Sequence, residues 1–172
     1  MVLDRIALPG ASVIKLVELT EIEIAVVGDE SSCLVAVELA EYENGEPFSS
    51  VICRGTRGSG GGFQFMELGF EVQLIASNGD VFSTQHPQIV RQYLPDDIRR
   101  EILPLVARCY SVILGTFRPG FVYRTCAYPD LPDAAMQKHH FLTKAVLDCG
   151  YYLHREETDE DGHTYWFCGA TN

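Results

Sequence analysis

The chain lacks the local patterns that mark the best-defined enzyme classes. No glycine-rich run ends in Gly-Lys-Ser or Gly-Lys-Thr, so a Walker A nucleotide loop is excluded. The sequence has no His-x-x-x-His pair for zinc, no Gly-x-Ser-x-Gly nucleophile turn and no His-Glu-x-x-His motif. The six cysteines include no Cys-x-x-Cys pair, and we expect them to be buried, reduced side chains. We therefore predict neither a metal site nor a bound cofactor.

A targeting or membrane-spanning pattern is also missing. Residues 1–9 have Asp4 beside Arg5, where a signal peptide has a basic region followed by a long apolar core. No run of the chain approaches the ~20 apolar residues of a membrane span. We therefore expect a cytoplasmic protein with no membrane partner.

Positive charge is scarce. The chain has 13 Lys and Arg against 24 Asp and Glu, which gives a net charge of −11 at pH 7. Residues 1–50 contribute −8 of this charge and residues 151–172 contribute −4. An acidic surface repels phosphate backbones, so we expect no nucleic-acid partner. The acidic N-terminal third suits solubility or a basic protein surface, and it leaves open an acidic inhibitor that imitates nucleic-acid charge.

Length and periodicity predict one α+β domain over residues 1–172. In the first half, apolar residues alternate with polar ones, and two Asn-Gly pairs predict hairpin turns, the first of type I′. Expected strands cover residues 21–26, 33–39, 48–54, 63–76 and 81–82. The apolar set of the fourth strand changes phase near Phe65, which we interpret as a β-bulge. The first half is therefore an antiparallel meander of about five strands.

The second half predicts helices and a closing hairpin. We expect a helix over 87–94 capped by Thr84, followed by a longer helix that begins at Pro95, has a kink or break at Pro104 and ends at Gly115. A strand over 121–127 and a helix that ends before Gly150 follow. The chain then forms a hairpin of residues 151–155 with residues 164–168. The predicted fold is an antiparallel sheet, made of the N-terminal meander plus the C-terminal hairpin, packed against two or three helices.

A glycine-rich patch covers residues 54–63, Arg-Gly-Thr-Arg-Gly-Ser-Gly-Gly-Gly-Phe. Its backbone N–H groups can surround an anion, and its two arginines can pair with phosphate. The patch suggests a small transferase that binds a phosphate-bearing cofactor such as acyl-CoA through Arg54, Arg57, Gly58 and Gly60. Known loops of this kind open a helix, whereas the residues that follow here predict a strand. The competing interpretation is an ordinary hairpin loop.

Two further groups carry weaker chemical signals. The neighbours His139 and His140 point about 100° apart on a helix and cannot easily share one metal. We expect one of them to face solvent and the other to border the core. Asp159, Asp161 and His163 match only part of a calcium loop, and we interpret them as the tip of a hairpin.

Aromatic residues gather in the C-terminal third of the chain. Strand alternation places aromatic side chains on both faces of the predicted C-terminal hairpin. One face is expected to pack on the core, and the other is surplus apolar surface of the kind that binds partners. The candidate interaction residues are Tyr151, Tyr152, Tyr165, Trp166 and Phe167.

Three functional hypotheses follow from these features. The first is a non-catalytic protein-interaction module that binds another protein or a second copy of itself, since a homodimer is the commonest outcome for such a surface. The second is the transferase with a phosphate-bearing cofactor. The third is the acidic inhibitor. The sequence favours the first, because no residue pattern positions a catalytic base.

Overall fold

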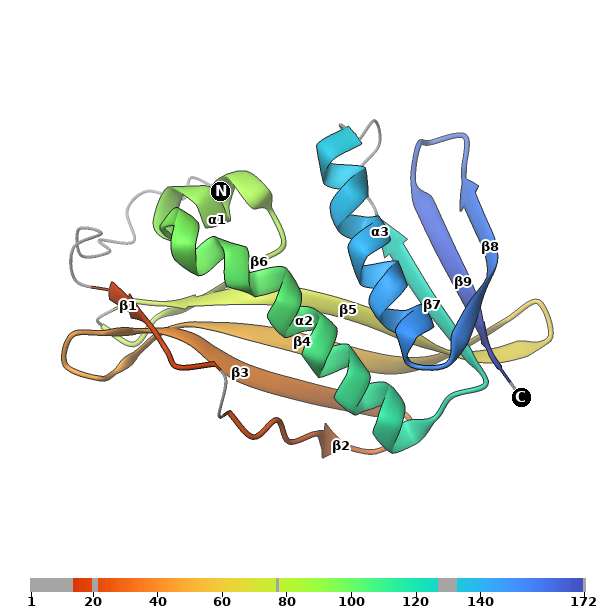
Figure 1. Cartoon of the computed structure of the whole chain (residues 1–172), viewed down its shortest axis with the longest axis horizontal. Helices are drawn as coiled ribbons and strands as arrows, with labels where there is room; N and C mark the ends of the chain where they lie inside the picture. Colours follow the sequence, from red (N-terminus) through yellow and green to blue (C-terminus); the bar gives the residue numbers. More distant parts are fainter. Residues whose placement is uncertain (1–13, 20–21, 77, 127–132, 172) are drawn as a thin grey trace. The chain divides into compact units, whose positions relative to one another are not determined.

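The computed structural model describes residues 14–19, 22–76, 78–126 and 133–171 (Figure 1). Along the chain its elements are β1 (Ile14–Leu16), β2 (Val27–Gly28), β3 (Ser32–Tyr42), β4 (Pro47–Gly60), β5 (Phe63–Ile75), β6 (Val81–Thr84), α1 (Pro87–Tyr93), α2 (Asp96–Phe117), β7 (Phe121–Cys126), α3 (Asp133–Asp148), β8 (Tyr151–Thr158) and β9 (Thr164–Ala170). The helices and the mostly antiparallel strands confirm the α+β class.

The sheet is larger than the predicted meander plus hairpin, and it is mixed. Its strands are hydrogen-bonded in the order β1-β3-β4-β5-β7-β9-β8, with β2 also beside β3 and β6 also beside β5. β7 runs parallel to β5, whereas β9 is antiparallel to both β7 and β8. Parallel neighbours need a long crossover, which β6, α1 and α2 supply. The all-antiparallel prediction was wrong because such a non-local pairing leaves no local signal in the sequence.

The expected first strand is not part of the sheet in its described residues, 22–26, although their exposure alternates as predicted. The cause is register along β3. β1 pairs with β3 as far as Ala40, and β2 pairs with it again from Leu34. Between these two pairings the chain has ten residues, 17–26, where β3 has only five, 35–39. Because the segment between β1 and β2 has twice as many residues as the facing part of β3, it cannot pair residue by residue with β3. Pairing resumes only at β2.

The two Asn-Gly turns are present, but they are not of type I′. Gly45 has a φ of 82°, and its N–H donates to the carbonyl of Tyr42 at 2.9 Å. Asn44 does not have a positive φ, so this is a three-residue loop with one left-handed glycine. The turn at Gly79 has the same hydrogen bond and a φ of 84°. Two successive positive φ angles occur instead at residues 61–62, between β4 and β5.

The helices lie where predicted and differ at their ends. Thr84 does not cap α1. Its hydroxyl accepts the N–H of His86 at 2.9 Å and so shapes the entry to the helix. α2 continues through Pro104 and Gly115 to Phe117, where we expected an interruption and an end. Its predicted apolar stripe is buried, namely Ile98, Ile102, Leu105, Val106, Cys109 and Ile113. Packing of this stripe outweighs the N–H donor that proline removes.

The chain divides into two compact units built from discontinuous segments. Unit 1 comprises Met1–Ile24, Ala36–Ile52 and Phe70–Leu105, and unit 2 comprises Ala25–Val35, Cys53–Gly69 and Val106–Asn172. In unit 1, the ring of Tyr42 meets Phe48 edge-on at 5.2 Å, and its hydroxyl donates to the carbonyl of Ile75 at 2.7 Å. In unit 2, Trp166 and Tyr110 are the largest fully buried side chains. None of the described helices is long and apolar enough to cross a membrane.

Substituting alanine at two glycines is expected to have opposite effects on stability. Gly115 lies inside α2 with open space around the position of a Cβ, so Gly115→Ala should raise the free energy of unfolding by roughly 0.5–1 kcal/mol. Gly45 needs a positive φ, so Gly45→Ala should lower it by about 1 kcal/mol. Urea denaturation measures both changes. A destabilised Gly115→Ala variant would contradict the continuation of α2 beyond residue 115.

Candidate functional site

In unit 2, the strands β5, β7, β9 and β8 form a sheet segment with two chemically different faces. Directly opposite residues share a face, and Tyr123 is opposite Phe167 whereas Arg124 is opposite Trp166. The second pair lies on the inner face, which α3 covers (Figure 1). There the imidazole of His139, from α3, stacks on Trp166 with 5.3 Å between ring centroids. The first pair lies on the outer face, turned away from α3.

Aromatic rings line the outer face, and we call this surface the aromatic face. It consists of Phe63 and Phe65 from β5, Phe121 and Tyr123 from β7, Tyr165 and Phe167 from β9, and Tyr152 from β8. Phe63 and Tyr152 are 50% and 46% exposed, and the other rings are partly buried. The surface is therefore apolar and only partly shielded from water by its own packing.

The rings of the aromatic face are packed against one another. Phe121 and Phe167 stack with 5.3 Å between centroids and 16° between their planes. Tyr123 and Tyr165 stack at 6.0 Å, and Phe65 meets Tyr123 at 5.3 Å. Such pairs contribute about 0.5–1.5 kcal/mol beyond the area that they bury. The rings thus form an ordered layer, and little side-chain entropy remains to be lost when a partner covers them.

Two glycines make room for these rings. A Cβ on Gly58 in β4 would come within 2.4 Å of a ring carbon of Phe65. A Cβ on Gly169 in β9 would lie 2.8 Å from the ring of Tyr152. Glycine weakens a strand, but here an aromatic ring from the neighbouring strand covers the exposed backbone. Gly58 therefore has a structural role in the aromatic face.

The predicted bulge near Phe65 is wrong. Buried and less buried residues alternate along β5 without a change of phase, and the buried set is Met66, Leu68, Val72 and Leu74. Phe63 and Phe65 have the opposite parity and belong to the aromatic face. The apparent change of phase arises because this end of β5 carries apolar side chains on both faces, whereas a single buried face was assumed.

The glycine-rich patch is not an open loop. β4 extends to Gly60, a two-residue turn follows, and the next residue begins β5. Arg57 donates to the carboxylate of Glu30 at 2.7 Å, and Arg54 is exposed and has interactions of its own. A strand thus stands where a phosphate-binding loop has a helix N-terminus. This geometry lends no support to the cofactor hypothesis, and cofactor binding by these residues stays a prediction.

The five aromatic residues predicted to bind a partner fall on both faces. Tyr152, Tyr165 and Phe167 belong to the aromatic face. Trp166 is fully buried against α3, and Tyr151 is buried with its hydroxyl bonded to the carbonyl of Pro119 at 2.8 Å. Neither of these two side chains can contact a partner while unit 2 is folded.

Four rings of the aromatic face lie outside the predicted set, namely Phe63, Phe65, Phe121 and Tyr123. A signal for them was present in the sequence. Aromatic residues occur two apart at 63 and 65, at 121 and 123, and at 165 and 167, and this spacing puts both members of each pair on one side of a strand.

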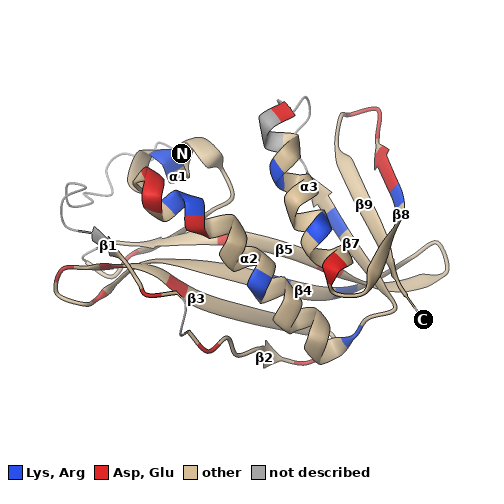
Figure 2. Cartoon of the chain, viewed as in Figure 1, with Lys and Arg blue, Asp and Glu red and all other residues tan. Residues whose placement is uncertain are grey.

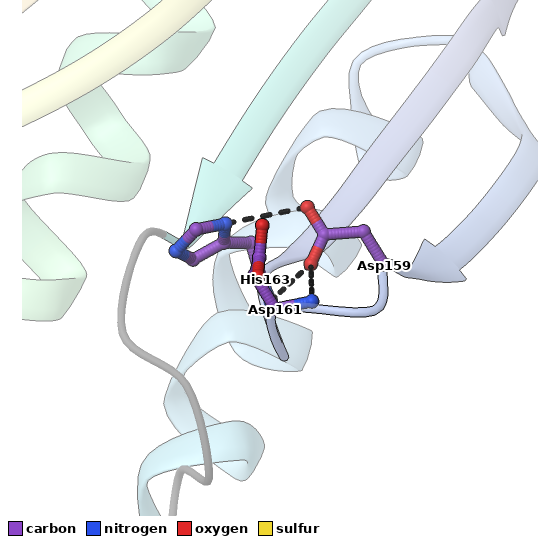
Figure 3. Close-up of side chains that lie close together, drawn as sticks. All are labelled: Asp159, Asp161 and His163. Carbon is purple, nitrogen blue, oxygen red and sulfur yellow. Dashed lines mark hydrogen bonds and ion pairs between the residues drawn. The ribbon is translucent and has the colours of Figure 1, made fainter.

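The β8–β9 turn is organised by one carboxylate, as Figure 3 shows for part of the group. Asp159 accepts the backbone N–H of Asp161 at 3.0 Å and of His163 at 2.8 Å, and it also accepts the hydroxyl of Tyr165 at 2.6 Å. The Tyr165 bond is the main cause that lowers the pKa of Asp159, and it raises the pKa of Tyr165 to about 12. Asp159, Asp161 and His163 thus form the predicted hairpin tip, and Asp159 anchors one end of the aromatic face.

Charges at the aromatic face come mainly from β8 and its turn (Figure 2). The acidic residues of this segment are Glu156, Glu157, Asp159, Glu160 and Asp161. Three charged residues of these strands share the aromatic face itself, since Glu67 is opposite Tyr123, Arg155 is opposite Phe167 and Glu157 is opposite Tyr165. The side chains of Arg155 and Glu157 form an ion pair of 2.8 Å and are largely exposed. The face therefore carries this ion pair and the further negative charge of Glu67 beside its rings.

Comparisons with known proteins add no assignment to this geometry. No family model, no curated protein and no solved structure matches the chain.

Alanine at Gly58 is expected to be poorly tolerated. The added Cβ would overlap the ring of Phe65, and overpacking of this kind typically costs 1–3 kcal/mol. Gly60→Ala is the matched control, because a Cβ there would lie 3.8 Å from the same ring, an ordinary contact distance. Thermal unfolding of the two variants checks this. If both are as stable as the unchanged protein, Phe65 does not lie over Gly58.

Lowering the pH is expected to reduce the stability of unit 2, because His139 binds a proton more readily in the unfolded state than in the folded state. Burial first, and then the positive charge of Arg124, lower the pKa of His139 to about 4, whereas an unfolded histidine has a pKa of about 6.5. The unfolded state therefore binds more protons between these values. This contribution to stability is fully present above pH 6.5 and is lost as the pH falls towards 4.

Urea unfolding at pH 7 and at pH 4.5 measures this loss. His139→Phe keeps a ring on Trp166 but cannot take up a proton, so its stability should change less between the two pH values. His140→Phe, at the adjacent exposed position, is the control and should retain most of the loss, because His140 lowers the pKa of His139 less than burial and Arg124 do. Equal losses in both variants would show that His139 is not the group responsible.

Proposed function

We propose that the protein is a non-catalytic interaction module whose aromatic face binds a second copy of the chain. The observation that carries this proposal is an ordered layer of rings, to which the imidazole of His154 links Tyr152 by contacting both Tyr152 and Phe167, and in which Phe63 and Tyr152 remain about half exposed. Contiguous aromatic surface of this kind is typical of protein interfaces, where tyrosine and phenylalanine are enriched.

The exposed parts of these rings give association a driving force. An aromatic side chain buries about 150–250 Å² when it is fully covered, so half a ring corresponds to roughly 100 Å². At about 25 cal/mol per Å², covering each half-exposed ring is worth roughly 2.5 kcal/mol before the cost of association. A two-fold dimer would cover two such rings from each copy.

The charges beside the rings favour a second copy as the partner. Arg155 and Glu157 lie on the same face with opposite signs, 2.8 Å apart. In a contact with two-fold symmetry, the same patch meets itself. Arg155 of one copy can then pair with Glu157 of the other, and the reverse pair forms as well. Such exchange keeps both charges neutralised at the rim while the rings are covered.

The edge strand is a poorer route to association. β8 ends the sheet order and carries a register shift between Leu153 and Arg155. Charged side chains and bulges on an edge strand hinder the addition of another strand. The proposed contact therefore runs through the faces of two sheets and not through their edges.

Removing the two most exposed rings tests the proposal. We expect Phe63→Ser with Tyr152→Ser to raise the dissociation constant of a dimer at least about ten-fold, a loss of 1.4 kcal/mol or more. Val81→Ser with Phe141→Ser is the matched control, because these apolar residues are similarly exposed and lie on β6 and α3. Sedimentation velocity over a range of protein concentrations measures the constant.

Two results would overturn the proposal. One is a protein that stays monomeric at all concentrations up to about 1 mM, the weak limit of specific association. The other is an equal loss of association in the test and control variants. Circular dichroism of every variant confirms that the fold is kept.

A further inference from the structure

The interior of unit 2 contains a positive charge for which the structure records no ion pair among the described residues. Arg124, on the inner face of β7, is 3% exposed. Its guanidinium carbon lies over the rings of Tyr110 and Trp166, 5.8 and 5.5 Å from their centroids. Removing a charged group from water is costly, and cation–π contacts return only part of that cost. The charge is thus only partly compensated.

The recorded hydrogen bonds of this guanidinium all come from one nitrogen. Nη1 donates to the carbonyl of His139 at 3.1 Å and to the hydroxyl of Thr143 at 2.9 Å. Nε is buried and has no partner. Nε and Nη2 form the edge of a guanidinium that binds a carboxylate through two parallel hydrogen bonds. This edge of Arg124 is therefore not engaged by a carboxylate of the described residues.

Three neighbouring polar groups are also buried without a well-formed hydrogen bond. The indole Nε1 of Trp166 and the Nδ1 of His139 are buried without a partner, and the buried hydroxyl of Tyr110 interacts with the side chain of Arg124 without forming a well-aligned hydrogen bond. Folded proteins leave few buried polar groups unpaired, because each such group loses its hydrogen bonds to water and gains none in return. Tyr110 stays protonated, because burial raises its pKa. Its hydroxyl and the indole N–H can therefore both donate, which suits a negatively charged guest.

We propose that Arg124, Tyr110, Trp166 and His139 form a binding site for a small ligand that carries a carboxylate. The carboxylate would pair with the Nε edge of Arg124 and accept from the hydroxyl or the indole N–H. A water molecule can satisfy single hydrogen bonds there, but it supplies no negative charge. The site is formed on the inner face and does not depend on association through the aromatic face.

Trp166 gives this proposal a direct probe, because it is the only tryptophan of the chain. The probe ligand is sodium acetate, exchanged for sodium chloride at constant ionic strength and pH 7.5. We expect a saturable change in tryptophan emission and a rise in melting temperature with acetate. Chloride has the same charge but lacks two oxygens to meet both N–H groups of the edge.

Three variants separate binding from folding. Arg124→Lys keeps the charge and loses the planar edge, so the dissociation constant of acetate should rise about ten-fold or more. Tyr110→Phe removes one donor with little change of shape, and a rise of about five-fold is expected. Tyr151→Phe is the control, since its hydroxyl bonds to Pro119 and not to this cluster, and it should leave the acetate response unchanged.

The proposal would be overturned if neither salt changed the emission and melting curves. It would also be overturned if acetate and chloride both gave a saturable response of the same size. If Arg124→Lys does not fold, Tyr110→Phe decides alone. An acetate affinity that this variant does not change would show that the ligand binds elsewhere.

Discussion

The register between β7 and β9 is the constraint on which the chemistry of unit 2 depends. Because side chains alternate between the faces of a sheet, a slip of one residue would exchange every inner side chain for an outer one. The observed register puts Arg124 and Trp166 under α3 and leaves Tyr123 and Phe167 outside. One face thereby becomes a core with a buried cation, and the other becomes a layer of partly exposed rings. Full burial of Trp166 makes the alternative register very costly.

Local patterns in the sequence predicted much of the fold. The alternating segments, the glycines of the turns and the periodic stripe of α2 each identified an element, because backbone geometry and burial impose them within a few residues. The errors in the architecture concern relations between distant segments, whereas the turn type, the Thr84 cap and the bulge near Phe65 were local errors. The parallel pairing of β5 with β7 depends on which strand the chain pairs with after α2. The break in pairing between β1 and β2 depends on where each of them aligns with β3. Continuation of α2 past Pro104 depends on packing that the helix sequence does not contain by itself.

The candidate site was predictable only in part, for a related reason. Alternation along the C-terminal hairpin identified Tyr152, Tyr165 and Phe167, but it could not tell which face would meet a helix, so Trp166 was grouped with them. The rings from β5 and β7 join the site only through strand order, which no local pattern specifies. Arg124 has an unremarkable sequence context, and its burial follows from α3 covering β9 and β7.

The fit of Phe65 over Gly58 and of Tyr152 over Gly169 has an evolutionary consequence. In each pair, the smallest and one of the largest side chains occupy adjacent strands, so neither position can change alone without opening a gap or creating a clash. Among descendants of this sequence, a larger residue at 58 is favoured beside a smaller one at 65, whereas a larger residue at 169 would meet only the outer end of the half-exposed Tyr152 side chain. The fit of Phe65 is then a sufficient reason for a glycine at position 58.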